Sequence, residues 1–174
     1  MAKVPFTKLK CKINENEIPV QIGEETIAVK QYLPIQEKLA LISEVIMMAH
    51  EPDANYSNPI KLKSLKELYI LFNYTNIAFT DKQKEDLPKL YDICNSSGLI
   101  NTVLLNIPTI ENEALNDGIN MTVEAVYNYQ NSILGILDTI KTDYSDTEFD
   151  IEQLSNMLGN TDLTLIQEVM NKLG

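Results

Sequence analysis

The sequence predicts a mainly α-helical domain led by a small β element, and three observations support this prediction. From Pro34 onward, apolar residues recur at the helical period, whereas the first thirty-odd residues alternate apolar and polar positions. The length of 174 residues suits one domain, and 44% hydrophobic with 22% charged residues is the composition of a folded globule. We therefore expect a single domain over 1–174. A β-rich element would occupy 1–32, and a helical domain of about six to seven helices would occupy 33–174.

The β element is expected to contain a strand and a hairpin. Residues 8–13 alternate apolar and polar, which predicts a strand that keeps Lys8, Lys10 and Lys12 in solvent. Residues 18–22 and 26–31 show the same period on either side of a turn at Gly23, which predicts a β-hairpin. The cysteines Cys11 and Cys94 lie at apolar periodic positions, so we expect both to be reduced core residues.

Three helical segments are expected between Pro34 and Gly98. The first opens at Pro34 and has its apolar positions at Ile35, Leu39, Ile42, Val45, Ile46 and Ala49. A loop over 51–58 ends at Asn58-Pro59, where the second begins. The pair Thr80 and Gln83 has the spacing of a capping box at the start of the third. Pro88 interrupts this third segment, which stops at Ser96-Ser97-Gly98.

The rest of the chain is also expected to be helical. A short apolar segment over 99–107 ends at Pro108, and the longest periodic stretch covers 119–140. In this stretch we expect Leu134 and Leu137 to be buried. Two short helices, separated by Gly159-Asn160, would close the chain.

The net charge of −11 is confined to the second half of the chain. Residues 1–89 contain 12 Lys and 12 Asp plus Glu, whereas residues 90–174 contain 2 Lys and 13 acidic residues, and the chain has no Arg. Such a balance disfavours nucleic acid and anionic membranes, because both are bound through Lys and Arg. No apolar run approaches the 18 residues of a membrane span, so we expect a cytoplasm-like compartment. The acid-free stretch that carries Lys3, Lys8, Lys10 and Lys12 could contact an acidic partner, but a strand with its lysines in solvent is the better explanation of the pattern.

No catalytic, cofactor-binding or metal-ligating residue is predicted. His50 is the only histidine, and its place after an apolar helix indicates a capping role at the helix C-terminus. Glycine-rich phosphate loops and nucleophile elbows are absent from the sequence. The calcium-like loop that begins at Asp53 lacks glycine at its sixth position, Asn58, and glutamate at its twelfth, Ser64. The sequence therefore favours a protein that is not an enzyme.

Aromatic residues are the candidates for contacts with a partner. Tyr69, Tyr91 and Tyr127 lie on apolar faces and are expected in the core. Four other aromatic residues are better placed to contact a partner: Tyr32, Tyr74, Phe79 and Tyr129.

Five stretches of the sequence together resemble proteins of tailed bacteriophages that infect low-GC Gram-positive hosts. In chain order these are Val29-Lys-Gln-Tyr-Leu-Pro-Ile-Gln-Glu-Lys-Leu, Asn58-Pro-Ile-Lys, Tyr74-Thr-Asn-Ile-Ala-Phe-Thr-Asp-Lys-Gln-Lys-Glu-Asp, Lys89-Leu-Tyr-Asp and Tyr127-Asn-Tyr-Gln-Asn-Ser-Ile-Leu-Gly-Ile-Leu-Asp. The proteins in question are virion morphogenesis proteins that look like tail assembly chaperones. The resemblance covers about residues 20–145 and rests on helix and loop signatures.

The resemblance implies a small, acidic, helical protein that acts in the host cytoplasm during phage tail assembly. Its partner would be the tape-measure protein, a long apolar helical chain that a chaperone keeps soluble. The protein could also form a homo-oligomer. The alternative is a structural subunit of the virion, such as a neck, connector or tail component. An unrelated host adaptor built from helices would fit the composition too.

Overall fold

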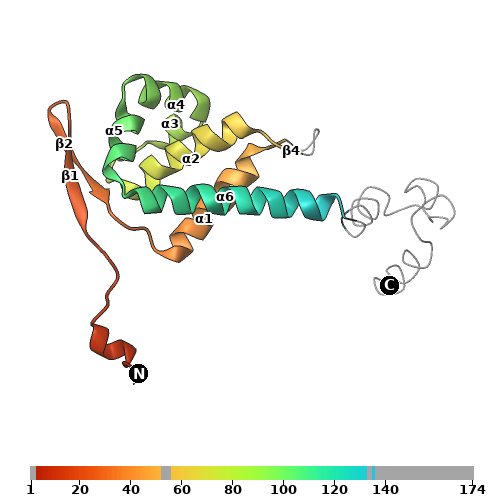
Figure 1. The fold of residues 1–174 in the computed structure, drawn as a ribbon. Coiled ribbons are helices and arrows are strands. Elements are labelled where there is room, and N and C mark those ends of the chain that lie inside the picture. The colour runs from red at the N-terminus through yellow and green to blue at the C-terminus, as the bar shows by residue number, and fades with distance from the viewer. Residues whose placement is uncertain (1–2, 52–55, 133–134, 136–174) are drawn as a thin grey trace, which may run out of the picture. The chain divides into compact units, whose positions relative to one another are not determined.

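The computed structural model of the protein describes residues 3–51, 56–132 and 135 and confirms a mainly helical fold that follows a small β-hairpin (Figure 1). Its contacts divide the chain into two compact units, residues 1–123 and 124–174. Of the second unit the structure describes only residues 124–132 and 135. The single domain over 1–174 therefore stays a prediction.

The predicted hairpin is confirmed. Strand β1 (Glu17–Ile22) pairs antiparallel with β2 (Glu25–Lys30), from Glu17 opposite Lys30 to Ile22 opposite Glu25. Gly23 occupies the turn with a φ of +61°, a left-handed conformation that glycine adopts without steric cost. On the far side of β2, the Ala28 N–H donates to Asn76 Oδ1 at 2.9 Å, which attaches the hairpin to the end of a helix.

The predicted strand over 8–13 is wrong. Phe6–Leu9 form a 3-10 turn, and residues 10–16 form no regular element. An alternating sequence becomes a strand only when another strand satisfies its backbone groups, and in the described part of the chain none lies beside residues 8–13. Cys11 is therefore exposed, contrary to its expected place in the core.

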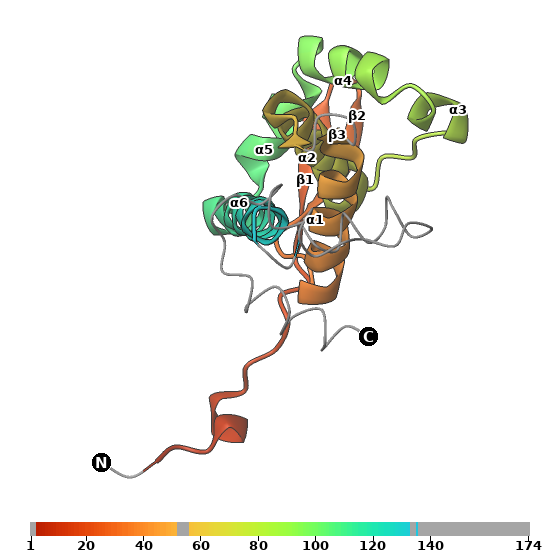
Figure 2. The ribbon, with the colours of Figure 1, turned by 90° about the vertical axis from the view of Figure 1, so that its right-hand side faces the viewer.

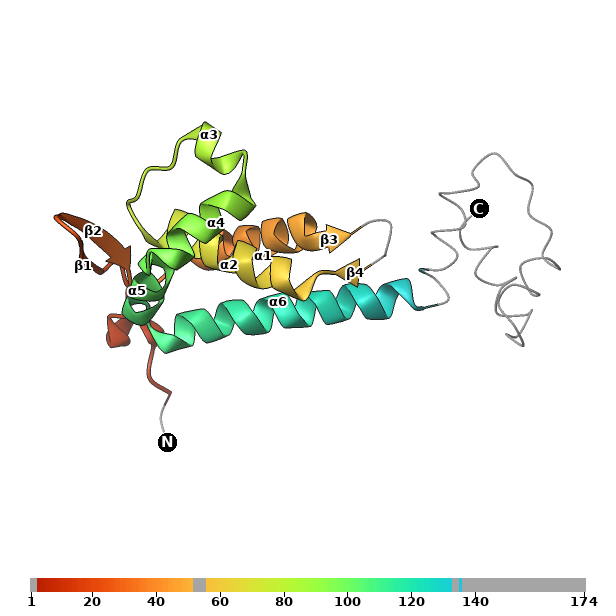
Figure 3. The same ribbon diagram turned by 90° about the horizontal axis from the view of Figure 1, so that it is seen from above.

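Helices α1 (Ile35–Ala49) and α2 (Pro59–Tyr74) form an antiparallel pair, joined through β3 (His50–Glu51) and β4 (Tyr56–Ser57), which pair with each other (Figure 3). The Asn58 side chain caps α2 by accepting from the N–H groups of Ile60 at 3.0 Å and Lys61 at 3.3 Å. His50 does lie at the C-terminus of α1, where its backbone N–H donates to the Ile46 carbonyl.

Three short helices follow: α3 (Asp81–Lys84), α4 (Leu87–Ser96) and α5 (Leu99–Asn106). The predicted capping box at α3 is confirmed, because the Thr80 N–H donates to Gln83 Oε1 at 2.8 Å and the Gln83 N–H to Thr80 Oγ1 at 3.3 Å. Gly98 separates α4 from α5 with a φ of +79°, as the predicted stop requires. Cys94 is buried as expected, and burial raises the pKa of its thiol.

Helix α6 (Thr109–Gln130) begins at Thr109, earlier than the expected start at residue 119. Its first part packs against α1, as the view along α6 in Figure 2 shows, with Glu111, Leu115 and Ile119 buried. Gly118 permits this approach, since a Cβ atom at residue 118 would lie 2.5 Å from Ile42 Cδ1. The core thus forms between the hairpin, the α1–α2 pair, α4, α5 and residues 107–123.

Several expectations fall at or beyond the end of α6. Tyr127 was expected in the core, but it is 61% exposed because the apolar contacts of the core end near Val123. Leu134, Leu137 and the two closing helices lie outside the described residues. Within the described residues, no helix has the length and apolar character needed to cross a membrane.

Candidate partner-binding surface

Of the predicted contact residues, Tyr32 and Tyr74 lie at one buried pair, Lys38 and Glu111, and Phe79 packs elsewhere. Tyr74 is fully buried, so the expectation that it faces a partner is wrong. Tyr32 is half-buried, with the Lys38 ammonium 4.5 Å from its ring centroid. Phe79 is also half-buried, against Phe72, whereas Tyr129 is exposed near the end of α6 in the second unit.

Tyr74 belongs to a buried polar cluster that the sequence did not reveal. Glu111 of α6 accepts from Lys38 Nζ at 2.7 Å, from Tyr74 Oη at 2.9 Å and from the Leu33 N–H at 3.1 Å. Lys38 and Glu111 are both at least nine-tenths buried. Each of these side chains thus has a hydrogen-bond partner, and the cluster ties α1, α2 and α6 to the segment before α1.

Burial also changes the proton affinity of the tyrosines that bond to acids. Burial, and then the hydrogen bond to Glu111, raise the pKa of Tyr74 well above its ordinary value. The same two causes, with Glu67 as the acceptor at 2.8 Å, raise the pKa of Tyr91 to about 12. Both phenols therefore remain neutral donors at physiological pH, which suits a structural role.

An aromatic cluster lies on the other side of α2. The ring of Phe72 is 5.5 Å from that of Tyr69 and 5.0 Å from that of Phe79, in tilted and edge-on arrangements. Lys84 of α3 places its ammonium 5.3 Å from the Phe72 ring centroid. These contacts attach the loop before α3 to α2, so Phe79 has a packing role that the sequence did not show.

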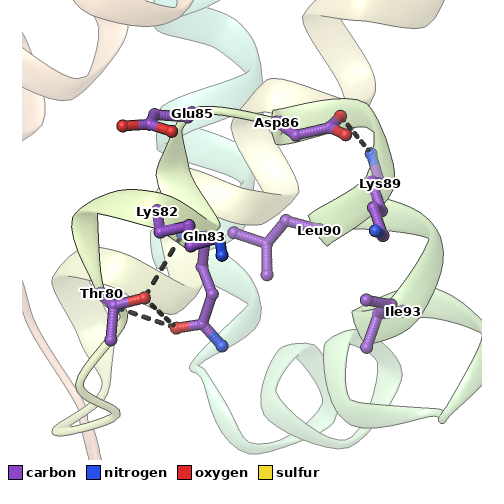
Figure 4. A pocket seen from close by; sticks show the side chains of 8 residues that line it. All are labelled: Thr80, Lys82, Gln83, Glu85, Asp86, Lys89, Leu90 and Ile93. Atoms are coloured by element: carbon purple, nitrogen blue, oxygen red, sulfur yellow. Dashed lines mark hydrogen bonds between the residues drawn. The ribbon is translucent and has the colours of Figure 1, made fainter.

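The largest pocket among those described lies between α3 and α4 and has a volume of about 570 Å³ (Figure 4). Figure 4 shows Leu90 between Gln83 of α3 and Lys89 of α4. Three of its polar side chains are occupied in capping: Thr80 and Gln83 bond to each other, and Asp86 Oδ1 accepts from the Lys89 N–H at 3.1 Å. The charged side chains of Lys82, Glu85 and Lys89 line it too. Within the described residues, no group of three or more His, Cys, Asp and Glu is placed to hold a metal ion.

Helix α1 presents a row of apolar side chains to solvent. Ile35, Leu39 and Met47 are 62%, 56% and 72% exposed, and with Ser43 they follow one another at intervals of four residues. We call this row, residues 35, 39, 43 and 47, the α1 stripe. Side chains four residues apart on a helix lie next to each other, so the stripe is one row along α1, in which the polar Ser43 separates Leu39 from Met47. The opposite face of α1, which contains Leu41 and Val45, is packed in the core.

No protein-family model, curated protein or solved structure matches the chain. The functional argument therefore depends on the surfaces described above.

Proposed function

We propose that this protein is a non-enzymatic assembly protein of a tailed bacteriophage, a tail assembly chaperone that binds the tape-measure protein in the host cytoplasm. The sequence resemblance suggests this class of protein. The α1 stripe is the observation that carries the proposal, because a chaperone of an apolar helical chain needs exposed apolar side chains on a fixed scaffold.

The chemistry of the α1 stripe suits a long helical partner of varied sequence. Met47, and Met48 beside it, have flexible and polarisable side chains that adapt to different apolar surfaces. Leu39 and Ile35 extend the strip toward the helix N-terminus. A partner helix laid along α1 would place its own apolar face on this strip, as amphipathic helices do in apolar grooves.

Charge supports the same proposal. The net charge of −11 would keep a complex with an apolar chain in solution through mutual repulsion. Tyr129 remains a candidate contact, because the residue is 51% exposed.

Co-expression with the tape-measure protein encoded beside this gene tests the proposal. We expect the tape-measure protein to be soluble when the chain is present and insoluble when it is absent, and purified virions to lack the chain. Equal insolubility in both cases would contradict the proposal. If mass spectrometry instead finds the chain at fixed stoichiometry in virions, the structural-subunit alternative replaces it.

A further inference from the structure

The N-terminal segment, residues 3–14, is an apolar and basic arm that the rest of the described chain does not cover. Four apolar side chains along it are 58–71% exposed, namely Val4, Phe6, Leu9 and Ile13. Four lysines lie among them and no acidic residue does. Its side-chain and turn hydrogen bonds are local, from Lys8 N–H to the Pro5 carbonyl and from Cys11 Sγ to the Leu9 carbonyl. Exposed apolar groups in such a row are unfavourable in water and indicate a surface that a partner covers.

A surface of complementary character lies on α6. Ile110 and Met121 are 72% and 70% exposed, and Ala114 between them is exposed too. Glu113 and Asp117 are exposed alongside, and α6 contains no lysine. We call residues 110, 113, 114, 117 and 121 the α6 stripe, and their spacing of three and four residues places them on one face of the helix.

The neighbouring lysines do not neutralise the α6 stripe. Lys66 of α2 donates to Asn112 at 3.4 Å and to Asn116 at 2.8 Å, on the flank of α6 that faces α2. Lys63 and Lys66 line a hollow with Asn116 and Asn120 on that same flank. None of the described ion pairs involves Glu113 or Asp117.

We propose that the arm of one copy of this chain docks on the α6 stripe of a second copy. The apolar side chains of the arm would cover Ile110, Ala114 and Met121. Its lysines would face Glu113 and Asp117. A second copy is favoured over nucleic acid or an anionic membrane, because the arm has no Arg, a single aromatic residue and a strongly acidic chain attached to it.

Charge reversal with rescue tests this contact in the full chain. We expect the native protein to self-associate with a Kd on the order of 1 μM. Sedimentation velocity at concentrations up to roughly 100 μM should therefore detect the associated species. The variant Lys8→Glu/Lys10→Glu/Lys12→Glu should weaken association at least about tenfold, and so should Glu113→Lys/Asp117→Lys. The two sets combined should restore it, which misfolding would not do. Reversal of the exposed lysines Lys82 of α3 and Lys89 of α4 to Glu is the control and should leave association unchanged.

A disulfide trap places the arm directly. Cys11 is exposed in the arm, so a cysteine introduced by Ala114→Cys should form an intermolecular disulfide with it on mild oxidation, whereas Asn101→Cys on α5 should not. A monomeric native protein, equal trapping at both positions, or a disulfide between Cys11 and the introduced cysteine of the same chain would overturn the proposal. So would unchanged association in the arm variant accompanied by lost binding to DNA or anionic vesicles, which would identify a polyanion as the partner of the arm.

Discussion

Glu111 is the residue on which three segments of the fold converge. Its carboxylate accepts from Lys38, Tyr74 and the Leu33 N–H, and the residue is buried. A buried ion pair adds little net stability, because desolvation of both charges offsets their attraction. Removal of one partner is costly, however, since the other charge stays buried without compensation. The cluster therefore selects one arrangement of the three helices.

We predict that Glu111→Gln lowers the free energy of unfolding by about 3–5 kcal/mol, because it leaves the Lys38 ammonium buried and unpaired. Adding Lys38→Met should recover part of this loss, because the second change removes the unpaired charge. Urea unfolding of the four chains of this cycle measures both effects. Glu113→Gln, at an exposed position of α6, should change stability by less than about 0.5 kcal/mol. Strictly additive losses for Glu111 and Lys38 would contradict the account.

Tyr74 and Tyr91 give the stability a defined dependence on alkaline pH. Their pKa values are raised in the folded chain, to about 12 for Tyr91 and further for Tyr74, whereas an unfolded tyrosine ionises near pH 10. The unfolded chain therefore releases protons that the folded chain retains. The stability due to these groups is complete below about pH 10 and is lost as the pH rises through the folded values.

A spectrophotometric titration of tyrosinate measures this behaviour. We expect Tyr74→Phe to remove absorbance only from the last step, the one that accompanies alkaline unfolding. Ionisation of Tyr74 together with the exposed tyrosines, while the chain is still folded, would contradict its burial and its hydrogen bond to Glu111.

At the scale of elements, the sequence predicted what depends on local chemistry. The helix over 35–49 follows from its apolar spacing, the start of α2 from Asn58-Pro59, the capping box from Thr80 and Gln83, and the stop from a glycine that adopts a positive φ. The strand over 8–13 failed because a strand depends on a partner elsewhere in the chain.

The candidate site was harder to predict, because burial of charged and aromatic groups is a tertiary property. Glu111 lies four residues before Leu115 and eight before Ile119, on the same face of α6. Because Glu111 is charged, it does not extend the apolar pattern by which the sequence indicates a buried helix face. Tyr74 follows Ile70 and Leu71 at the spacing of a buried face. That spacing was a signal for its burial. The α1 stripe had no such signal, because Ile35 and Leu39 look like core residues until α6 is seen to pack on another face of α1.

The approach of α6 to α1 at Gly118 gives a prediction for a pair of elements. In the native chain, a Cβ at residue 118 would contact Ile42 Cδ1, so Gly118→Ala forces Ile42 to move. An Ile42→Val chain lacks that atom. In this chain Gly118→Ala should raise the free energy of unfolding by roughly 1 kcal/mol, because alanine has a higher helix propensity than glycine. Urea unfolding of the double-mutant cycle should therefore show a coupling of about 1 kcal/mol between residues 42 and 118. Equal effects of Gly118→Ala in both chains would show that the helices do not approach there.

For the whole molecule, the buried polar cluster at Glu111 and the exposed apolar side chains of the α1 stripe have separate roles. Glu111 and its partners fix how α1, α2 and residues 109–123 pack. That packing leaves Ile35, Leu39 and Met47 in solvent. The net charge of −11 opposes aggregation of such a surface. An acidic scaffold with a fixed apolar strip is the physical form that the proposed chaperone role requires.

A matched pair of leucine substitutions tests this central claim most directly. Leu39 and Leu105 are 56% and 77% exposed, the first in the α1 stripe and the second on α5. Each is replaced by Lys, and the soluble fraction of the co-expressed tape-measure protein is measured, with urea unfolding as a check on the fold. Loss of one buried leucine contact is worth about 1.5–3 kcal/mol, or roughly tenfold or more in affinity. The account predicts that Leu39→Lys sharply lowers this soluble fraction while Leu105→Lys leaves it unchanged. An equal effect of the two substitutions would contradict it.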